Sequence, residues 1–459
     1  MTAYADFLAG RAHTNQGHGF EPLWLPDDLF PLQRHLTDWA LRQGRAAVFA
    51  DCGLGKSLME LVWAHNVYKH TGRPVLLLTP LAVTFQMAAE ADKFGMDAAV
   101  SRDGATPAPV TVTNYERLHR FDPDQFAGVV CDESSVLKSF DGTTRAAVTE
   151  FCRTLPYRLL GTATAAPNDY PELGTSSEAL GYLGHTDMLS RYFTNREKTI
   201  TGKKGRWRAS AGEAWRFKGH GEEPFWRWVT TWARAVRRPS DLGYDNAGFD
   251  LPALNVAEHV VDARAAAEGV LFDVPANGLH QQRDEARRTI AERCETAAGL
   301  LGGAETAVAW CQLNAEGDLL TRLIDGAVQV SGADPVEAKE EKLAAFSAGE
   351  IRALVTKPAV GAWGLNWQHC NRMTYFPDHS YERWYQAIRR CWRYGQTRPV
   401  GVDLITTSGG ARVLANLQRK AAAADRMFDR LVTHMRDAAD AEPTDTYETP
   451  VEAPPWVTS

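Results

Sequence analysis

Residues 50–57 decide the fold of this chain, and they read Ala50, Asp51, Cys52, Gly53, Leu54, Gly55, Lys56 and Ser57. A short apolar run, Ala46 to Phe49, precedes this stretch, and a helical pattern begins after it at Leu58. The order predicts a strand, a glycine-containing loop and a helix, which is the local structure that a phosphate-binding loop requires.

The residue types in this loop fit the binding of a nucleotide polyphosphate. Backbone N–H groups of such a loop point toward phosphate oxygens, and the N-terminus of the following helix adds a partial positive charge. Gly53 and Gly55 let the backbone approach the phosphates, although Ala50 replaces the first glycine of the GxxxxGKS/T motif. We expect Lys56 to reach the β- and γ-phosphates and the Ser57 hydroxyl to ligate Mg²⁺.

Length and composition indicate a soluble globular protein of two or three domains, since 459 residues are 44% hydrophobic and 23% charged. No apolar run reaches the roughly 18 residues of a membrane span, and the N-terminus lacks the layout of a secretory signal. We therefore expect a cytoplasmic protein without a membrane partner. The seven cysteines are scattered and never spaced as CxxC, which argues against disulfides and zinc and favours reduced, mostly buried thiols.

Strands and helices alternate beyond the loop. Val75 to Leu78 reads as a buried strand followed by Thr79, and Val110 to Val112 repeats the design before Thr113 and Asn114. This βαβα order predicts a parallel sheet whose ligands gather at the carboxyl ends of the strands, where these Thr and Asn residues would lie.

An acidic pair follows a third strand, Val129 to Cys131. Asp132 and Glu133 at the same sheet edge complement a phosphate loop, because one carboxylate can ligate Mg²⁺ and the other can orient or deprotonate the attacking water. We assign the metal to Asp132 and the water to Glu133. The alternative is a solvated Asp-Glu turn.

Gln33 lies ahead of the loop, in an amphipathic helix that Leu29 to Gln33 opens toward Ala40. A glutamine in this place can hydrogen-bond an adenine edge. A surface glutamine without this role is the alternative.

Taken together, the stretches FPLQ (30–33), ADCGLGKS (50–57), LLLTP (76–80), TNYE (113–116), VVCDESS (129–135) and GTAT (161–164) resemble the first ATPase lobe of superfamily 2 helicases. The resemblance is closest to Swi/Snf-type DNA translocases and to phage and prophage helicases. It implies ATP and Mg²⁺ as cofactors and a second lobe that supplies arginines. One departure is Ser134 and Ser135, which replace the Ala and His of many relatives.

The second half of the chain supplies the elements of such a second lobe. Strand patterns cover 307–311, 328–330 and 353–355, with helix patterns at 318–324 and around 340–346. Residues 361–366, which include Gly364, resemble motif V of the family. Residues 386–396 resemble its motif VI, QAxGRxxRxGQ, with Arg389 in place of the glycine.

By this resemblance, Arg390 and Arg393 are arginine fingers, and Gly364 and Gln386 contact the nucleotide. It also implies that Thr79, Thr113, Asn114, Ser331 and Thr356 face nucleic acid. Independently of the family, Arg390 and Arg393 are three residues apart, so on a helix they share one face and can address one phosphate group. An exposed basic helix face is the alternative.

A basic, tryptophan-rich stretch separates the two lobes. Residues 191–238 carry 13 Lys and Arg against four Glu, and five of the chain's 14 Trp lie there. Basic residues interleaved with aromatic ones suit phosphate contacts and base stacking. The densest basic cluster is Lys203, Lys204, Arg206 and Arg208. Equally favoured is an insertion whose Trp side chains pack on the first lobe.

The predicted fold class is therefore α/β, with two RecA-like parallel-sheet lobes in tandem, an inter-lobe insertion and a C-terminal helix. The predicted ranges are an N-terminal segment (1–20), an ATP-binding lobe (21–185), the insertion (186–255), a second lobe with the helix (256–436) and an acidic tail expected to be disordered (437–459).

The predicted function is an ATP-dependent translocase or helicase acting on single- or double-stranded DNA, in the host cytoplasm if the chain is phage-encoded. An ATP-dependent RNA helicase and a non-catalytic DNA-binding scaffold are the alternatives. Because the chain as a whole carries a net charge of −7, any attraction for nucleic acid must come from local basic stretches.

Overall fold

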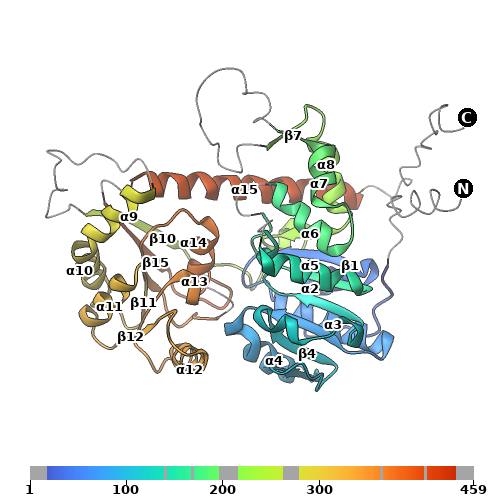
Figure 1. The fold of residues 1–459 in the computed structure, drawn as a ribbon, viewed down its shortest axis with the longest axis horizontal. Helices are drawn as coiled ribbons and strands as arrows, with labels where there is room; N and C mark the ends of the chain where they lie inside the picture. The colour runs from blue at the N-terminus through green and yellow to red at the C-terminus, as the bar shows by residue number, and fades with distance from the viewer. Residues whose placement is uncertain are drawn as a thin grey trace, which may run out of the picture.

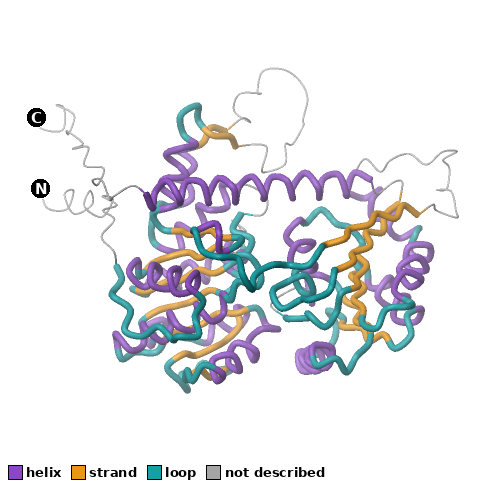
Figure 2. Tube along the Cα trace, turned by 180° about the vertical axis from the view of Figure 1, so that it is seen from behind, coloured by secondary structure: helices purple, strands orange, loops and turns teal. Residues whose placement is uncertain are grey.

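The structure is a computed structural model that describes residues 18–138, 142–166, 170–195, 215–261, 279–361, 365–407 and 411–440 (Figure 1). Two α/β lobes lie side by side, and one long helix, α15, runs across both (Figures 1 and 2). The predicted class of two parallel-sheet lobes in tandem with a C-terminal helix is confirmed.

Lobe 1 is built on a seven-stranded sheet with the order β3-β4-β2-β5-β6-β1-β9, in which every neighbouring pair is parallel. The central strands are short and fully buried, as expected where helices cover both faces of a parallel sheet. The strands are β1 (Arg45–Ala50), β2 (Val75–Thr79), β3 (Ala98–Val100), β4 (Val110–Asn114), β5 (Gly128–Cys131), β6 (Tyr157–Gly161) and β9 (Ala233–Val236). The helices are α2 (Pro31–Gln43), α3 (Lys56–Thr71), α4 (Thr84–Lys93), α5 (Thr143–Thr154), α6 (Leu173–Leu180), α7 (His185–Tyr192) and α8 (Glu222–Thr230).

Lobe 2 repeats the design with a six-stranded parallel sheet in the order β10-β15-β14-β11-β13-β12. Its strands are β10 (Leu254–Val261), β11 (Ala307–Trp310), β12 (Ala327–Val330), β13 (Ala353–Thr356), β14 (Arg372–Tyr375) and β15 (Val400–Thr407). Its helices are α9 (Leu279–Arg288), α10 (Ile290–Leu301), α11 (Asn314–Leu323), α12 (Val336–Ser347), α13 (Pro358–Gly361) and α14 (Tyr381–Ile388).

The region predicted as an inter-lobe insertion (186–255) contributes strand β9 to lobe 1 and the first residues of β10 to lobe 2. Strand β9 pairs with β1 in the register Ala47 with Ala233, so the lobe 1 sheet extends to Val236 rather than ending before residue 186. Trp226 and Trp232 are fully buried in the lobe 1 core. These two side chains therefore cannot stack on nucleic-acid bases in this conformation. They pack on the first lobe, which was the alternative expectation.

A small antiparallel hairpin of β7 (Phe193–Asn195) and β8 (Trp215–Phe217) lies in the same region, beside α8 (Figure 1). Phe193 and Phe217 stack with ring centroids 4.6 Å apart. The predicted basic cluster of Lys203, Lys204, Arg206 and Arg208 lies outside the described residues, as do Gly364 and residues 441–459 of the predicted tail.

Helix α15 (Ala411–Asp440) joins the lobes and extends beyond the predicted end at residue 436. Leu414 near its start packs in the lobe 2 core, whereas Phe428 and Leu431 pack in the lobe 1 core. Arg237, which follows β9, pairs with Asp425 at 3.2 Å and with Asp429 on the helix. No helix in the described part of the chain, α15 included, is apolar over enough of its length to cross a membrane.

All seven cysteines are buried free thiols, as predicted.

Candidate nucleotide-binding site between the lobes

The phosphate loop has the predicted strand-loop-helix form, because β1 ends at Ala50 and α3 begins at Lys56. Gly53 has a φ of 90° and Gly55 a φ of 76°, which is the left-handed region that glycine adopts without strain. A Cβ on Gly53 would lie 2.8 Å from the backbone nitrogen of Tyr394. Both glycines are thus needed, one of them because lobe 2 contacts the loop directly.

Lys56 lies within its own loop in this conformation. Its Nζ donates to the carbonyl oxygens of Ala50 at 2.7 Å and Asp51 at 3.4 Å. Within the described residues the ammonium group forms no salt bridge, and Ser57 lies beside it, half-buried. These carbonyl oxygens accept the hydrogen bonds of the lysine ammonium group, and phosphate oxygens can replace them as acceptors.

Gln33 is buried against the loop rather than exposed on the surface. Its Nε2 donates to Leu54 O at 3.0 Å, and its Oε1 accepts from the Phe30 N–H at 3.1 Å. The side chain therefore caps its own helix and supports the loop. To donate from Nε2 to adenine, Gln33 must give up its hydrogen bond to the Leu54 carbonyl oxygen.

Asp132 and Glu133 follow β5 and are each only 6% exposed, so the alternative of a solvated turn is excluded. Burial and the adjacent Glu133 charge raise the pKa of Asp132 to about 7, against the lowering effect of Lys56. Glu133 has a φ of 53° and is the one non-glycine residue with a positive φ in the described ranges. Such a conformation costs about 1–3 kcal/mol and is typical of functional sites.

Two side chains converge on the Glu133 carboxylate. Thr162, in the GTAT stretch after β6, donates to Oε2 at 3.3 Å. Gln386 of lobe 2 donates to the same oxygen at 3.4 Å. The carboxylate is thus held from both lobes, which suits a group that must be oriented toward a water molecule.

Arg390 and Arg393 do not share a helix face as predicted, because α14 ends at Ile388 and both arginines lie in the turns that follow. They nevertheless converge, since each donates from Nη1 to the carbonyl oxygen of Leu365, at 3.0 and 3.4 Å. Arg390 is 2% exposed and also donates to Gln386 Oε1 at 2.9 Å. A carbonyl acceptor, rather than helical spacing, brings the two guanidinium groups together.

The two arginines carry positive charge that no carboxylate neutralises at close range. Neither forms a salt bridge with any residue that the structure describes, and Arg393 Nε is buried without a hydrogen-bond partner there. Burial and the neighbouring Arg390 charge lower the pKa of Arg393 to about 10. The charge of Arg390 in turn acts on Asp132, so these groups lie within electrostatic reach of the acidic pair.

Four of the residues predicted to face nucleic acid are structural in this conformation. The side chains of Thr79, Thr113, Asn114 and Thr356 are at most 2% exposed. Their side-chain oxygens bond within the protein; for example, Thr113 Oγ1 donates to Ser101 O at 2.9 Å and Thr356 Oγ1 to Val330 O at 2.9 Å. Direct contact with a nucleic acid is excluded for these side chains here, whereas Ser331 is half-buried and stays a candidate.

Three residues that the sequence did not single out lie around the site. Tyr115 donates from its hydroxyl to Asp132 O at 2.6 Å, and Tyr385 donates to the Asp51 carboxylate. Glu60, 2% exposed on α3, has neither carboxylate oxygen hydrogen-bonded in the described structure. Its place four residues after Lys56 on a helix was a usable signal, because that spacing puts both on one face.

The donor set fits Mg²⁺ with a polyphosphate. Ser57 and Asp132 offer the oxygen ligands that this hard cation prefers. Burial and the neighbouring Glu133 charge disfavour the ionised form of Asp132 and raise its pKa, and a bound divalent ion would favour the ionised form. Among described residues no cluster of three or more His, Cys, Asp or Glu is arranged to hold a metal by itself, and Mg²⁺ in nucleotide sites commonly relies on substrate phosphates.

No protein-family model matches the chain, and no curated protein matches it. Among solved structures, the chain is similar to the Sulfolobus solfataricus SWI2/SNF2 ATPase core in complex with dsDNA. The TM-score is 0.40 at 19% sequence identity, over 84% of this chain and 90% of that one.

Proposed function

We propose that this protein is a nucleic-acid-dependent ATPase that couples ATP hydrolysis to movement along DNA. One observation carries the ATPase part: Lys56 of lobe 1 and Arg390 and Arg393 of lobe 2 gather around the acidic pair, and none of them forms a salt bridge within the described residues. Uncompensated cations beside a phosphate loop suit a polyphosphate ligand.

Lobe 1 would hold the substrate. Backbone N–H groups of the loop and the start of α3 would bind the phosphates, with Lys56 at the β- and γ-phosphates and Gln33 as the candidate for adenine. Ser57 and Asp132 would hold Mg²⁺, which when bound neutralises phosphate charge. The prediction that Gly364 contacts the nucleotide stays a proposal, since this residue lies outside the described ranges.

Glu133 would position and deprotonate the attacking water. Its contacts with Thr162 and Gln386 restrain the carboxylate, and restraint of the base relative to the bound phosphate is what this step requires. Arg390 and Arg393 would stabilise charge that develops on the transferred phosphoryl group.

Movement along DNA would follow from the position of the site between two lobes. A ligand that contacts both lobes favours their closed arrangement, and its hydrolysis and release remove those contacts. The choice of DNA rests on the motif resemblance to Swi/Snf-type translocases and on the basic stretch that includes Lys203, Lys204, Arg206 and Arg208. The same resemblance favours a role in phage or prophage DNA metabolism.

The deciding experiment is the ATPase rate of the full chain without nucleic acid and with single-stranded DNA, duplex DNA or RNA. We expect stimulation by DNA. Stimulation by RNA alone would support an RNA helicase instead. Absence of hydrolysis in all four reactions, with protein shown to be folded by circular dichroism, would establish a non-catalytic scaffold.

A further inference from the structure

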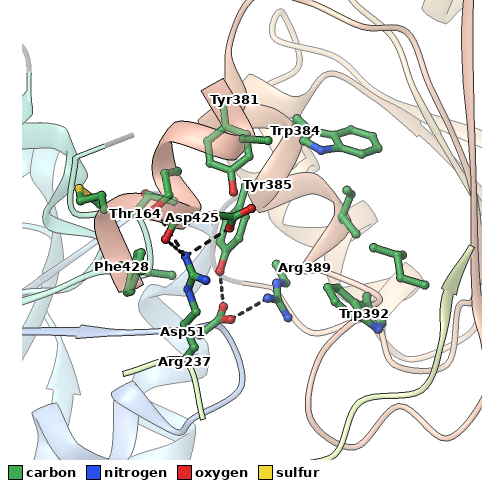
Figure 3. Close-up of a pocket in the computed structure, with 16 residues that line it drawn as sticks. Asp51, Thr164, Arg237, Tyr381, Trp384, Tyr385, Arg389, Trp392, Asp425 and Phe428 are labelled. Atoms are coloured by element: carbon green, nitrogen blue, oxygen red, sulfur yellow. Dashed lines mark hydrogen bonds and ion pairs between the residues drawn. The ribbon is translucent and has the colours of Figure 1, made fainter. Parts of the chain in front are cut away.

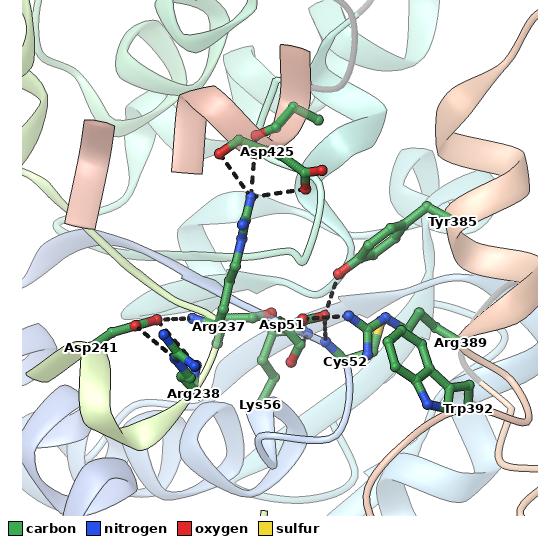
Figure 4. A network of polar contacts seen from close by, with 12 residues as sticks. Asp51, Cys52, Lys56, Arg237, Arg238, Asp241, Tyr385, Arg389, Trp392 and Asp425 are labelled. Atoms are coloured by element: carbon green, nitrogen blue, oxygen red, sulfur yellow. Dashed lines mark hydrogen bonds and ion pairs between the residues drawn. The ribbon is translucent and has the colours of Figure 1, made fainter. Parts of the chain in front are cut away.

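Arg389 connects lobe 2 directly to the phosphate loop. It follows the last residue of α14, is 8% exposed, and donates from Nη2 to Asp51 Oδ2 at 2.6 Å (Figure 4). The motif that this segment resembles has glycine at this position, so the resemblance assigns Arg389 no role. The ion pair is therefore a feature of this chain's own sequence.

Asp51 passes this restraint on to the loop. Its Oδ1 accepts from the Cys52 N–H at 2.6 Å, and its own N–H donates to Val236 O at 2.9 Å. Tyr385 of α14 donates to the same Oδ1 (Figure 4). Two of the three donors to this carboxylate thus come from lobe 2, so the first turn of the loop is held from outside its own lobe.

The guanidinium group is kept charged and fixed in direction. It lies over the ring of Trp392 at 4.3 Å and near that of Tyr385 at 5.1 Å. Although burial opposes the charged form, Asp51 holds the pKa of Arg389 above its ordinary value. Loss of either partner would leave a buried charge without compensation, which is strongly unfavourable.

Packing alone does not fix the lobes at this point. A cavity of about 280 Å³ borders the ion pair and is lined from both lobes and α15, with Thr164, Trp384 and Phe428 among its walls (Figure 3). Because part of the interface is open space, van der Waals contact restrains the lobes less here than in a filled core. The directional bonds of Arg389 and Tyr385 to Asp51 cross this part of the interface and restrain it where packing is incomplete.

The same segment carries the residues that reach the acidic pair. Gln386, three residues before Arg389, donates to Glu133, and Arg390 follows directly. The bond between Arg389 and Asp51 therefore fixes the distance of Gln386 and Arg390 from the phosphate loop.

We propose that Arg389 is a positioning residue, which acts through Asp51 to place Gln386 and Arg390 relative to bound ATP. This role rests on the proposed ATPase function. It requires that hydrolysis depend on the ion pair more than ATP binding does. Arg389 bonds the carboxylate of Asp51, whereas Lys56 bonds the backbone carbonyl oxygen of that residue.

The test compares Arg389→Gln, Arg389→Lys, Asp51→Asn and the double variant Asp51→Asn with Arg389→Gln. Because a hydrogen bond to a charged group is stronger than a neutral one, Arg389→Gln should lower kcat at least about ten-fold, with KM for ATP changed less than about three-fold. Arg389→Lys should recover part of the rate. The double variant should be no slower than the worse single variant, because both remove one interaction.

Arg383→Gln is the matched control, since Arg383 lies on α14, which Arg389 directly follows, but pairs with Asp378 of its own lobe at 3.0 Å. Its kcat should equal that of the wild type. A thermal melt checks that each variant folds, and Arg389→Lys carries the comparison if Arg389→Gln does not fold.

Amide hydrogen exchange of residues 51–57 gives a second readout that needs no hydrolysis. Exchange should be faster in Arg389→Gln than in wild type and unchanged in Arg383→Gln. Unchanged exchange, an unchanged or raised kcat, or additive effects in the double variant would each overturn the positioning role. Absence of hydrolysis by the wild type overturns the proposed function instead, and the exchange measurement still decides the role of Arg389.

Discussion

The side-chain amide of Gln386 in lobe 2 lies 3.4 Å from the carboxylate of Glu133 in lobe 1, while its carbonyl oxygen accepts from Arg390 at 2.9 Å. One glutamine therefore links the candidate catalytic base to a candidate arginine finger. A change in the separation of the lobes would break the contact between Gln386 and Glu133, so the proposed hydrolysis should depend on how the lobes are arranged.

Glu133→Gln should bind ATP and nucleic acid but hydrolyse ATP about 10²- to 10⁴-fold more slowly, because a general base contributes about that much. The amide keeps a similar shape and still meets Thr162. Binding of a fluorescent ATP analogue and single-turnover hydrolysis measure the two properties. If the variant fails to bind ATP, Glu133 is a structural or metal residue rather than the base.

Lys56→Ala should abolish hydrolysis and leave the melting temperature nearly unchanged. Among the residues that the structure describes, the ammonium group hydrogen-bonds the loop carbonyls of Ala50 and Asp51, and Lys56 is half-buried, so it supports little packing. Phosphate binding, by contrast, depends on its charge. Turnover near the wild-type rate would contradict the assignment of the phosphate loop.

Arg390→Ala and Arg393→Ala should each reduce turnover more than ATP affinity. Arginine fingers act mainly in the transition state and contribute about 10³- to 10⁵-fold in other phosphoryl-transfer enzymes. Steady-state kcat and equilibrium ATP binding separate the two effects. Arg398→Ala is a suitable control, because that arginine is half-buried and pairs with Glu305 and the His369 carbonyl oxygen. Weaker ATP binding with normal turnover would argue against the finger role.

The stability of Glu60→Gln relative to wild type should increase as pH rises. Burial raises the pKa of Glu60 well above its ordinary value, with the Asp132 charge adding to it, so the folded state binds a proton more tightly than the unfolded state. The stability from this group is complete below the unfolded pKa and is lost as pH rises through the folded pKa. Between the unfolded and the folded pKa of Glu60, the free energy of unfolding of the wild type should fall, relative to that of the variant, by up to about 1.4 kcal/mol per pH unit.

Chemical denaturation of both proteins from pH 5 to 9 measures this difference. Glu150→Gln, an exposed position on α5, should show no such trend. A stability difference between wild type and Glu60→Gln that does not vary with pH would mean that Glu60 has an unrecognised partner.

Changing Lys203, Lys204, Arg206 and Arg208 together to Gln should weaken DNA binding and flatten its salt dependence. Each phosphate contact contributes a slope of roughly −0.9 in log affinity against log salt on duplex DNA. ATPase activity without nucleic acid should hardly change, because we do not expect the cluster to line the ATP site. An unaltered slope would mean that this stretch meets another protein or packs on lobe 1.

The sequence by itself determined the local elements of the site. Residues 50–57 form the predicted loop because glycines at 53 and 55 adopt a positive φ and because the strand before and the helix after them follow from short-range patterns. Alternation of such strands and helices also determined the two parallel lobes, since parallel strands need crossover helices.

Tertiary structure alone decided which distant residues meet. Spacing suggested a helix for Arg390 and Arg393, yet the carbonyl of Leu365 brings them together. Composition left the role of Trp226 and Trp232 open, and the structure shows both side chains buried in the lobe 1 core. The Arg389 and Asp51 pair joins residues 338 positions apart. Long-range contacts of this kind depend on complementary shape and charge between finished elements, which no local period or propensity encodes.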